Sequence, residues 1–280
     1  MLPSDNNNSS IDYSKIPRDF KKFNEYLGLP EKKGISYPMF QYQHDIREKI
    51  LSNKHIIINK FTGAGMTETI PRICAEIMCT IGMDHNQVAV ITGTNMAFTQ
   101  EVMNTRIKAL FTTNHPELIN HKKTNKNIIT LTNDYYFKGY PTDHIDVLRG
   151  QDDISLIFID EAAFFHSNRQ EELRIAVERY DSKTNPIIIW NSTPNGPQGA
   201  YYNIWENATK EENQHYIPIT LNWKLGLDTI FTPEDITALN YTQKTNPRLF
   251  AQEYDNQFIS PQGSMMPQLD ESPELVEEIL

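Results

Sequence analysis

Residues 55–67 read HIIINKFTGAGMT, an apolar run that breaks into a loop with two glycines. Such a run is typical of a buried strand in a parallel sheet. A glycine-containing loop after it lets backbone N–H groups turn toward an anion at the start of the next helix. We therefore expect a phosphate-binding loop in which the hydroxyl of Thr67 reaches Mg²⁺. The position before Thr67, where such loops carry lysine, holds Met66.

The missing positive charge is expected to come from Lys60, at the first position of the same eight-residue pattern. Its flexible side chain can reach back across the loop toward phosphate oxygens. Met66 would then pack beside the following helix, and Met66→Lys should be tolerated or mildly activating. The predicted nucleotide-binding residues of this segment are Lys60, Thr62, Gly63, Ala64, Gly65, Met66 and Thr67. Two alternatives stay open: the loop is a turn that binds nothing, or Lys60 points to solvent.

A second apolar run, SLIFIDEAAFF at residues 155–165, places two acids at the end of a predicted central strand. The carboxyl ends of parallel strands are where ligands bind in open α/β sheets. In ATPases with a phosphate loop, the first such acid holds Mg²⁺ together with the loop threonine, and the second activates the attacking water. We assign these roles to Asp160 with Thr67, and to Glu161. Two adjacent acids at a strand end also occur by chance.

A third run, IIIWNSTPNG at residues 187–196, again ends in small polar residues. A Pro-Asn-Gly turn explains the same residues without any function, and Trp190 is expected in the core. Three strands that end in polar residues nevertheless converge on one crevice. Strands that alternate with helices predict a parallel sheet flanked by helices on both faces.

The sequence IDEAAF followed by STPNG resembles the ATPase domain of a terminase large subunit, the viral DNA-packaging motor. Ser192, Thr193 and Pro194 match the coupling motif of that family, which links the γ-phosphate to motion. Gln43 lies upstream of the loop at a spacing like that of the family's adenine-recognition glutamine. Arg149 with its following glycine resembles a pair whose arginine acts on a neighbouring subunit's nucleotide in some of these motors. Certain phage terminases also carry the lysine at the first position of the loop, the position that Lys60 holds here.

The resemblance implies a P-loop NTPase fold of the RecA/ASCE type, a parallel sheet flanked by helices with a small C-terminal lid subdomain, and ATP and Mg²⁺ as cofactors. The expected division is a polar arm with a short helix at 1–35, an ATPase core at 36–222, a lid at 223–260, and an acidic linker or tail at 261–280. In the full-length family a nuclease domain follows. It is expected either to have been removed from this chain or to reside on another polypeptide.

By the same resemblance, the chain uses ATP hydrolysis to translocate double-stranded viral DNA into a procapsid. Its implied partners are the portal protein, the small terminase subunit and copies of itself in a ring on the procapsid. The resemblance is also compatible with a chain that is monomeric in solution. The chain has 280 residues and a formal charge of −10. Net repulsion from DNA phosphates argues against a stand-alone DNA-binding protein. A helicase-like translocase and a nucleotide-binding protein with little hydrolysis remain alternatives.

The sequence shows no apolar stretch of membrane-spanning length and no secretion signal, so we expect a protein of the host-cell cytoplasm without membrane contact. Cys74 and Cys79 are expected to be reduced core thiols. The eight histidines show no paired ligand spacing, so a metal–histidine site is not expected. The expected helices are 19–26, 43–53, 66–81, 96–112, Pro233 to Gln243 and Pro247 to Asn256. The expected strands are 55–60, 87–92, 128–132, 155–160 and 186–191.

Overall fold

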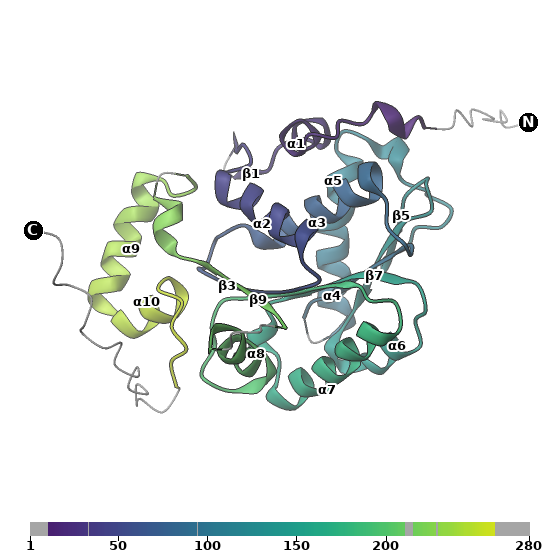
Figure 1. Ribbon diagram of the computed structural model, residues 1–280. Helices are drawn as coiled ribbons and strands as arrows, with labels where there is room; N and C mark the ends of the chain where they lie inside the picture. Colours follow the sequence, from purple (N-terminus) through teal and green to yellow (C-terminus); the bar gives the residue numbers. More distant parts are fainter. Residues whose placement is uncertain (1–10, 33, 94, 211–214, 228, 261–280) are drawn as a thin grey trace, which may run out of the picture.

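The computed structural model describes residues 11–32, 34–93, 95–210, 215–227 and 229–260. At its centre lies a seven-stranded sheet with helices on both faces (Figure 1). In spatial order the strands are β5 (Ile128–Thr130), β6 (Tyr136–Tyr140), β4 (Gln87–Ile91), β7 (Ile154–Asp160), β8 (Ile187–Ser192), β3 (His55–Lys60) and β9 (Ile217–Leu221). Neighbouring strands are parallel, except that β5 runs antiparallel to β6. The predicted α/β fold of the P-loop type is therefore confirmed.

The central strands are buried on both faces, which explains why their sequences are continuous apolar runs. In β7, Leu156 and Phe158 point into one hydrophobic cluster, whereas Ile157 and Ile159 point into another on the opposite face. Side chains alternate in this way because successive residues of a strand point to opposite faces. Trp190 in β8 is fully buried in the second cluster, as expected.

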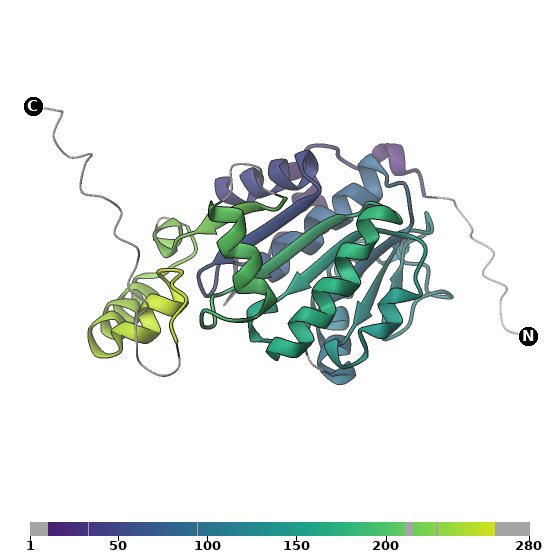
Figure 2. The ribbon, with the colours of Figure 1, turned by 60° about the horizontal axis from the view of Figure 1, so that its bottom comes forward.

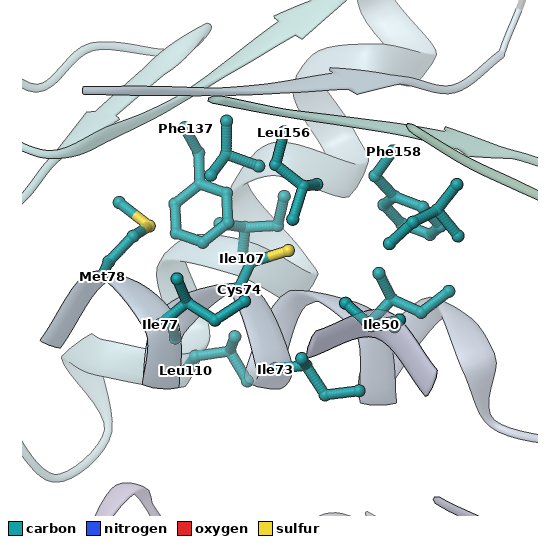
Figure 3. Close-up of a cluster of buried hydrophobic side chains, with 14 of the residues drawn as sticks. Ile50, Ile73, Cys74, Ile77, Met78, Ile107, Leu110, Phe137, Leu156 and Phe158 are labelled. Carbon is teal, nitrogen blue, oxygen red and sulfur yellow. The ribbon is translucent and has the colours of Figure 1, made fainter. Parts of the chain in front are cut away.

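Two layers of helices cover the sheet (Figures 1 and 2). One face carries α1 (Phe20–Leu27), α2 (Gln41–Ser52), α3 (Met66–Glu76), α4 (Met96–Val102) and α5 (Ala109–Thr112), and the other carries α6 (Asp146–Arg149), α7 (Ser167–Glu178) and α8 (Gly199–Lys210). Figure 3 shows Ile73 and Cys74 of α3 lying beneath Phe137 and Leu156 of the sheet. Cys74 and Cys79 are buried free thiols, as predicted. A short hairpin, β1 (Glu31–Lys32) with β2 (Ile35–Ser36), lies outside the main sheet.

Several predicted boundaries need correction. The helix expected at 66–81 is α-helical only to Glu76 and ends in a π-helical turn at Ile77–Ile81. The helix expected at 96–112 is interrupted by a π-helical turn at Met103–Lys108. Strands β6 and β9 were not predicted, and the sheet is mixed, not wholly parallel. The first expected helix is confirmed as α1, with Asp19 as its N-cap and Phe23 in the core.

Two helices follow the sheet, α9 (Pro233–Thr245) and α10 (Pro247–Glu253), and lie to one side of it (Figure 1). Thr232 caps α9: its hydroxyl accepts from the N–H of Asp235 at 3.2 Å. Helix α10 is shorter than predicted: it ends at Glu253 and not at Asn256. The lid function of this pair stays a prediction. The predicted polar start at 1–10 and acidic tail at 261–280 lie outside the described residues. None of the helices in the described ranges is long and apolar enough to cross a membrane.

Candidate functional site

The loop after β3 opens the N-terminus of α3 toward the carboxyl edge of the sheet. Gly65 is the N-cap of α3 and has φ 74°, in the left-handed region that glycine enters without steric cost. Gly63 has φ 91°. No side chain caps the helix, and the N–H groups of a first helical turn have no partners within the helix. The loop therefore leaves N–H groups available for an anion.

Two residues of α2 hold the loop in place. Tyr42 Oη donates to the carbonyl of Ala64 at 3.0 Å. Gln43 accepts from the N–H of Phe40 at 2.8 Å through Oε1 and donates to Thr69 Oγ1 at 2.7 Å through Nε2. The carboxamide thus ties the start of α2 to α3. The adenine-recognition role of Gln43 stays a prediction.

Lys60 points into the site and not into solvent, so that alternative is wrong. The residue is only 5% exposed. Its Nζ donates to Glu161 Oε1 at 2.8 Å and to Thr193 Oγ1 at 3.0 Å. One ammonium group therefore joins the ends of β3, β7 and β8. Met66, in contrast, is buried in the core and faces away from solvent.

Asp160 is the buried acid of the site, and each of its oxygens accepts a hydrogen bond from a side chain. Oδ2 accepts from Thr67 Oγ1 at 2.7 Å, and Oδ1 accepts from Asn191 Nδ2 at 2.6 Å. Burial, together with the nearby charge of Glu161, raises the pKa of Asp160, while the hydrogen bonds and Lys60 oppose this shift. A hydroxyl oxygen next to a carboxylate is a donor set that Mg²⁺ prefers. Thr67 and Asp160 therefore fit the predicted magnesium site.

Glu161 combines an unusual backbone with an accessible carboxylate. Its φ of 53° places it in the left-handed region, which is strained for a residue with a side chain. Its side chain is 42% exposed. Glu161, Asp160 and Thr67 border an open cavity of about 500 Å³. A carboxylate at the wall of such a cavity can accept a proton from a water molecule inside it.

The predicted coupling residues lie directly behind the two acids. Ser192 Oγ accepts from the N–H of Ala163 at 3.1 Å, so the end of β8 is bonded to the turn that follows Glu161. Thr193 receives the Lys60 ammonium, and Pro194 is buried beside it. A change at the phosphate loop can therefore reach β8 through direct contacts.

Arg149 does not lie with the other predicted site residues. It ends α6, ahead of the first residue of β7, whereas Asp160 is the last residue of that strand. Seven residues at about 3.3 Å per residue place the strand ends roughly 20 Å apart. The Arg149 side chain contacts Asp146 at 3.5 Å and is partly exposed. A catalytic role on this chain's own nucleotide does not fit this position, and a role toward a neighbouring subunit stays a prediction.

Three contacts of the site were not predicted from the sequence. Asn191 bonds Asp160, Tyr42 bonds the loop, and Glu253 bonds Thr62. The N–H of Thr62 donates to the carbonyl of Glu253 at 2.7 Å, and its hydroxyl donates to the carboxylate of the same residue. Asn191 lies in the polar end of the third apolar run, so its place at the carboxyl edge of the sheet could have been predicted from the sequence. The contact with Glu253 depends on the folded chain and left no local signal.

The strand order separates β3 from β7 by one strand, so Lys60 and Glu161 meet across β8. A sheet of this order, with a glycine-containing loop after one strand and an acid pair after another, is the arrangement of the P-loop NTPase fold. The chain belongs to the family described as terminase large subunit, T4likevirus-type, N-terminal, which matches residues 42–272. The predicted family is thereby confirmed.

Solved structures with a similar fold come from phages. The large terminase ATPase domain of Thermus phage P74-26 is 16% identical, with a TM-score of 0.58, and the match covers 85% of this chain and 98% of that one. The HK97 bacteriophage large terminase is also 16% identical, with a TM-score of 0.64, over 85% of this chain and 54% of that one. A large terminase of a thermophilic bacteriophage, in complex with ADP, is 13% identical, with a TM-score of 0.58, over 79% and 54%. At these identities the likeness shows the fold alone. No curated protein sequence matches the chain.

Proposed function

We propose that this domain is the ATP-hydrolysing motor of a terminase large subunit, which couples hydrolysis to the translocation of double-stranded viral DNA into a procapsid. The observation that carries the proposal is the position of the Lys60 ammonium, bonded to both Glu161 and Thr193. This contact joins the loop, the water-activating acid and the coupling residue. The family match and the terminase solved with ADP support nucleotide as the ligand.

Each residue contributes a separate part of the chemistry. Thr67 and Asp160 would hold Mg²⁺, which neutralises charge on the phosphates. Lys60 is expected to exchange Glu161 for phosphate oxygens, which leaves that carboxylate free to take a proton from the attacking water. When Lys60 moves, Thr193 loses its hydrogen bond from the ammonium group. The end of β8 therefore responds to whether a phosphate is bound at the loop.

The proposed assembly is a ring of copies on the portal of a procapsid, with the small terminase subunit as a further partner and the host cytoplasm as the location. In that ring Arg149 would act on the neighbouring subunit's nucleotide. The formal charge of −10 supports an arrangement in which DNA is bound by several subunits together and not by one.

A nucleotide-binding protein with little hydrolysis is the second candidate, because Met66 replaces the usual loop lysine. The contact of Lys60 with Glu161 favours the ATPase, since it supplies both a cation and a water-activating acid at one site. A helicase-like translocase shares these parts. An assay for separation of the two DNA strands distinguishes a helicase, because a packaging motor does not need to separate them.

The test is a DNA-stimulated ATPase assay together with nucleotide binding. Glu161→Gln should keep ATP affinity while turnover falls by about 10²–10⁴, the usual contribution of a general base. Asp160→Asn should weaken binding only in the presence of Mg²⁺. Glu117→Gln, which removes an exposed carboxylate away from the site, is the matched control. Unchanged turnover in both site variants would contradict the roles assigned to Glu161 and Asp160.

A further inference from the structure

The structure brings together three potential metal ligands at the end of the sheet opposite the phosphate loop. His55 begins β3, His215 precedes β9, and Asp181 follows α7. One ligand atom from each lies within 4.8 Å of the others. The site is separate from the nucleotide site, because Lys60 lies at the other end of β3, roughly 17 Å away at about 3.3 Å per residue.

The carboxylate of Asp181 contacts one nitrogen of each imidazole. Its Oδ1 is 2.8 Å from His55 Nε2, and its Oδ2 is 3.4 Å from His215 Nε2. The two imidazole rings face each other, with centroids 4.1 Å apart and planes inclined by 31°. In a tetrahedral zinc site with bonds of about 2.0–2.2 Å, neighbouring ligand atoms are about 3.3–3.6 Å apart. To bind one ion, the two imidazoles would have to turn from this facing arrangement so that their nitrogens converge on it.

Secondary structure fixes the backbones that carry these ligands. His55 pairs with Ile188 in the β3–β8 ladder, and the next residue of β3 pairs with Ile217 at the start of β9. Asp181 follows Tyr180, which is fully buried and whose hydroxyl donates to the carbonyl of Leu148. A site whose ligands are already ordered loses little conformational entropy when it binds.

We propose that His55, Asp181 and His215 form a binding site for a divalent transition-metal ion, with Zn²⁺ as the best match. Two imidazole nitrogens and one carboxylate oxygen are ligands that suit zinc and its neighbours, whereas Mg²⁺ and Ca²⁺ prefer oxygen alone. Three protein ligands leave a fourth position for water. The bound ion fastens the starts of β3 and β9 to the segment that follows α7. Sequence spacing could not indicate this site, because its histidines come from segments far apart in the chain.

The experiment uses the full chain without a histidine tag, freed of metal with a chelator and returned to chelator-free buffer. Zn²⁺ is then titrated against a chromophoric competitor. Wild type should bind one equivalent, and His215→Ala and Asp181→Asn should each weaken binding by at least about 10-fold. His121→Ala, which removes another exposed histidine, should bind like wild type.

The unfolding midpoint, measured with and without Zn²⁺, tests whether these three side chains bind a metal ion or only hydrogen-bond to one another. Zn²⁺ should raise the unfolding midpoint of wild type and of His121→Ala but not that of His215→Ala, because only binding to the folded chain stabilises it. His215 has a side chain that is 58% exposed, so its loss should leave the fold intact, which circular dichroism checks. Equal Zn²⁺ affinity in wild type and in folded His215→Ala would overturn the proposal. So would the absence of a stoichiometric site in wild type.

Discussion

At the scale of single residues, Lys60 decides how this site differs from an ordinary phosphate loop. A lysine before the threonine would extend from the helix, whereas Lys60 extends from the end of β3 and already contacts Glu161 and Thr193. The position of Met66 in the core revises one expectation. Met66→Lys would place an ammonium group among apolar side chains, which is costly unless the charge is paired, so we now expect that variant to be destabilised.

Lys60→Ala should weaken ATP binding by about 10- to 100-fold, since hydrogen bonds to charged groups contribute about 1.5–3 kcal/mol. Equilibrium titration with a fluorescent ATP analogue measures this loss. Lys54→Ala is the matched control, because Lys54 is an exposed lysine just before the same strand. Wild-type affinity and turnover in Lys60→Ala would show that the charge comes from another residue or another subunit.

Asp160→Asn should stabilise the magnesium-free protein near neutral pH. Because burial raises the pKa of Asp160 above its ordinary value of 3.8, the folded chain holds this proton more tightly than the unfolded chain. The stability that the proton contributes is present at low pH and is lost as the pH rises through the raised pKa. Asparagine has no charge to bury, so we expect a gain of about 0.5–2 kcal/mol.

Urea unfolding at about pH 5 and about pH 7.5, without Mg²⁺, checks this expectation, since the gain should be larger at the higher pH. Asp134→Asn, which changes an exposed aspartate away from the site, is the control variant. A variant less stable than wild type at the higher pH would contradict it.

At the scale of elements, the outcome of prediction depended on where a strand lies in the sheet. The central strands β3, β4, β7 and β8 are largely apolar because both of their faces are buried, so continuous apolar runs marked them in the sequence. Strand β9 contains Pro218, which is compatible with a strand only at an edge, where β9 lies. Strand β6 contains Gly139, where a Cβ would lie 2.7 Å from Thr99 Cγ2. Close packing of α4 explains that glycine, and a single sequence does not show it.

The candidate site was predictable where its residues follow apolar runs. Lys60, Thr67, Asp160, Glu161 and Thr193 all end or follow a strand, and the parallel sheet brings such ends together. Partners that reach the site from elsewhere were not predictable. Their contacts depend on tertiary packing, which leaves no period or motif in the sequence.

Glu253→Ala should loosen the connection between α10 and the phosphate loop. The variant removes the carboxylate that accepts the Thr62 hydroxyl but keeps the backbone contact, so the free energy of unfolding should fall by about 0.5–1.5 kcal/mol. Hydrogen exchange should become faster in the loop and in α10. Glu234→Ala, which alters an exposed carboxylate in α9, should leave both segments unchanged. Exchange at wild-type rates in Glu253→Ala would show that the backbone contact alone holds α10.

At the scale of the whole molecule, Arg149 and the phosphate loop lie toward opposite ends of the sheet: Arg149 precedes β7, whereas the loop follows β3 at the carboxyl edge. A nucleotide at the loop is therefore out of reach of its own Arg149, whereas a neighbouring copy could present its arginine. An arginine supplied in this way contributes about 10³–10⁵ in rate in other phosphoryl-transfer enzymes. The isolated chain is accordingly expected to be a weak ATPase.

Mixing Arg149→Ala protein with Glu161→Gln protein should restore part of the activity that each lacks alone, because one copy supplies the arginine and the other an intact acid. Turnover is measured against total protein concentration. Arg169→Ala, which removes a partly exposed arginine of α7, replaces Arg149→Ala in the control mixture. No recovery at concentrations where wild type is active would argue against a role between subunits.

The left-handed backbone of Glu161 has a consequence for directed evolution. Glycine fits φ 53° with less strain than glutamate, and asparagine tolerates it better than most residues. Because either substitution removes the carboxylate that pairs with the buried Lys60 ammonium, a library screened for heat resistance alone should enrich glycine or asparagine here together with an uncharged residue at position 60. Only a screen that also scores turnover would retain glutamate there, so the substitutions recovered under the two regimes would reveal how much thermal tolerance the domain gives up to keep its acid.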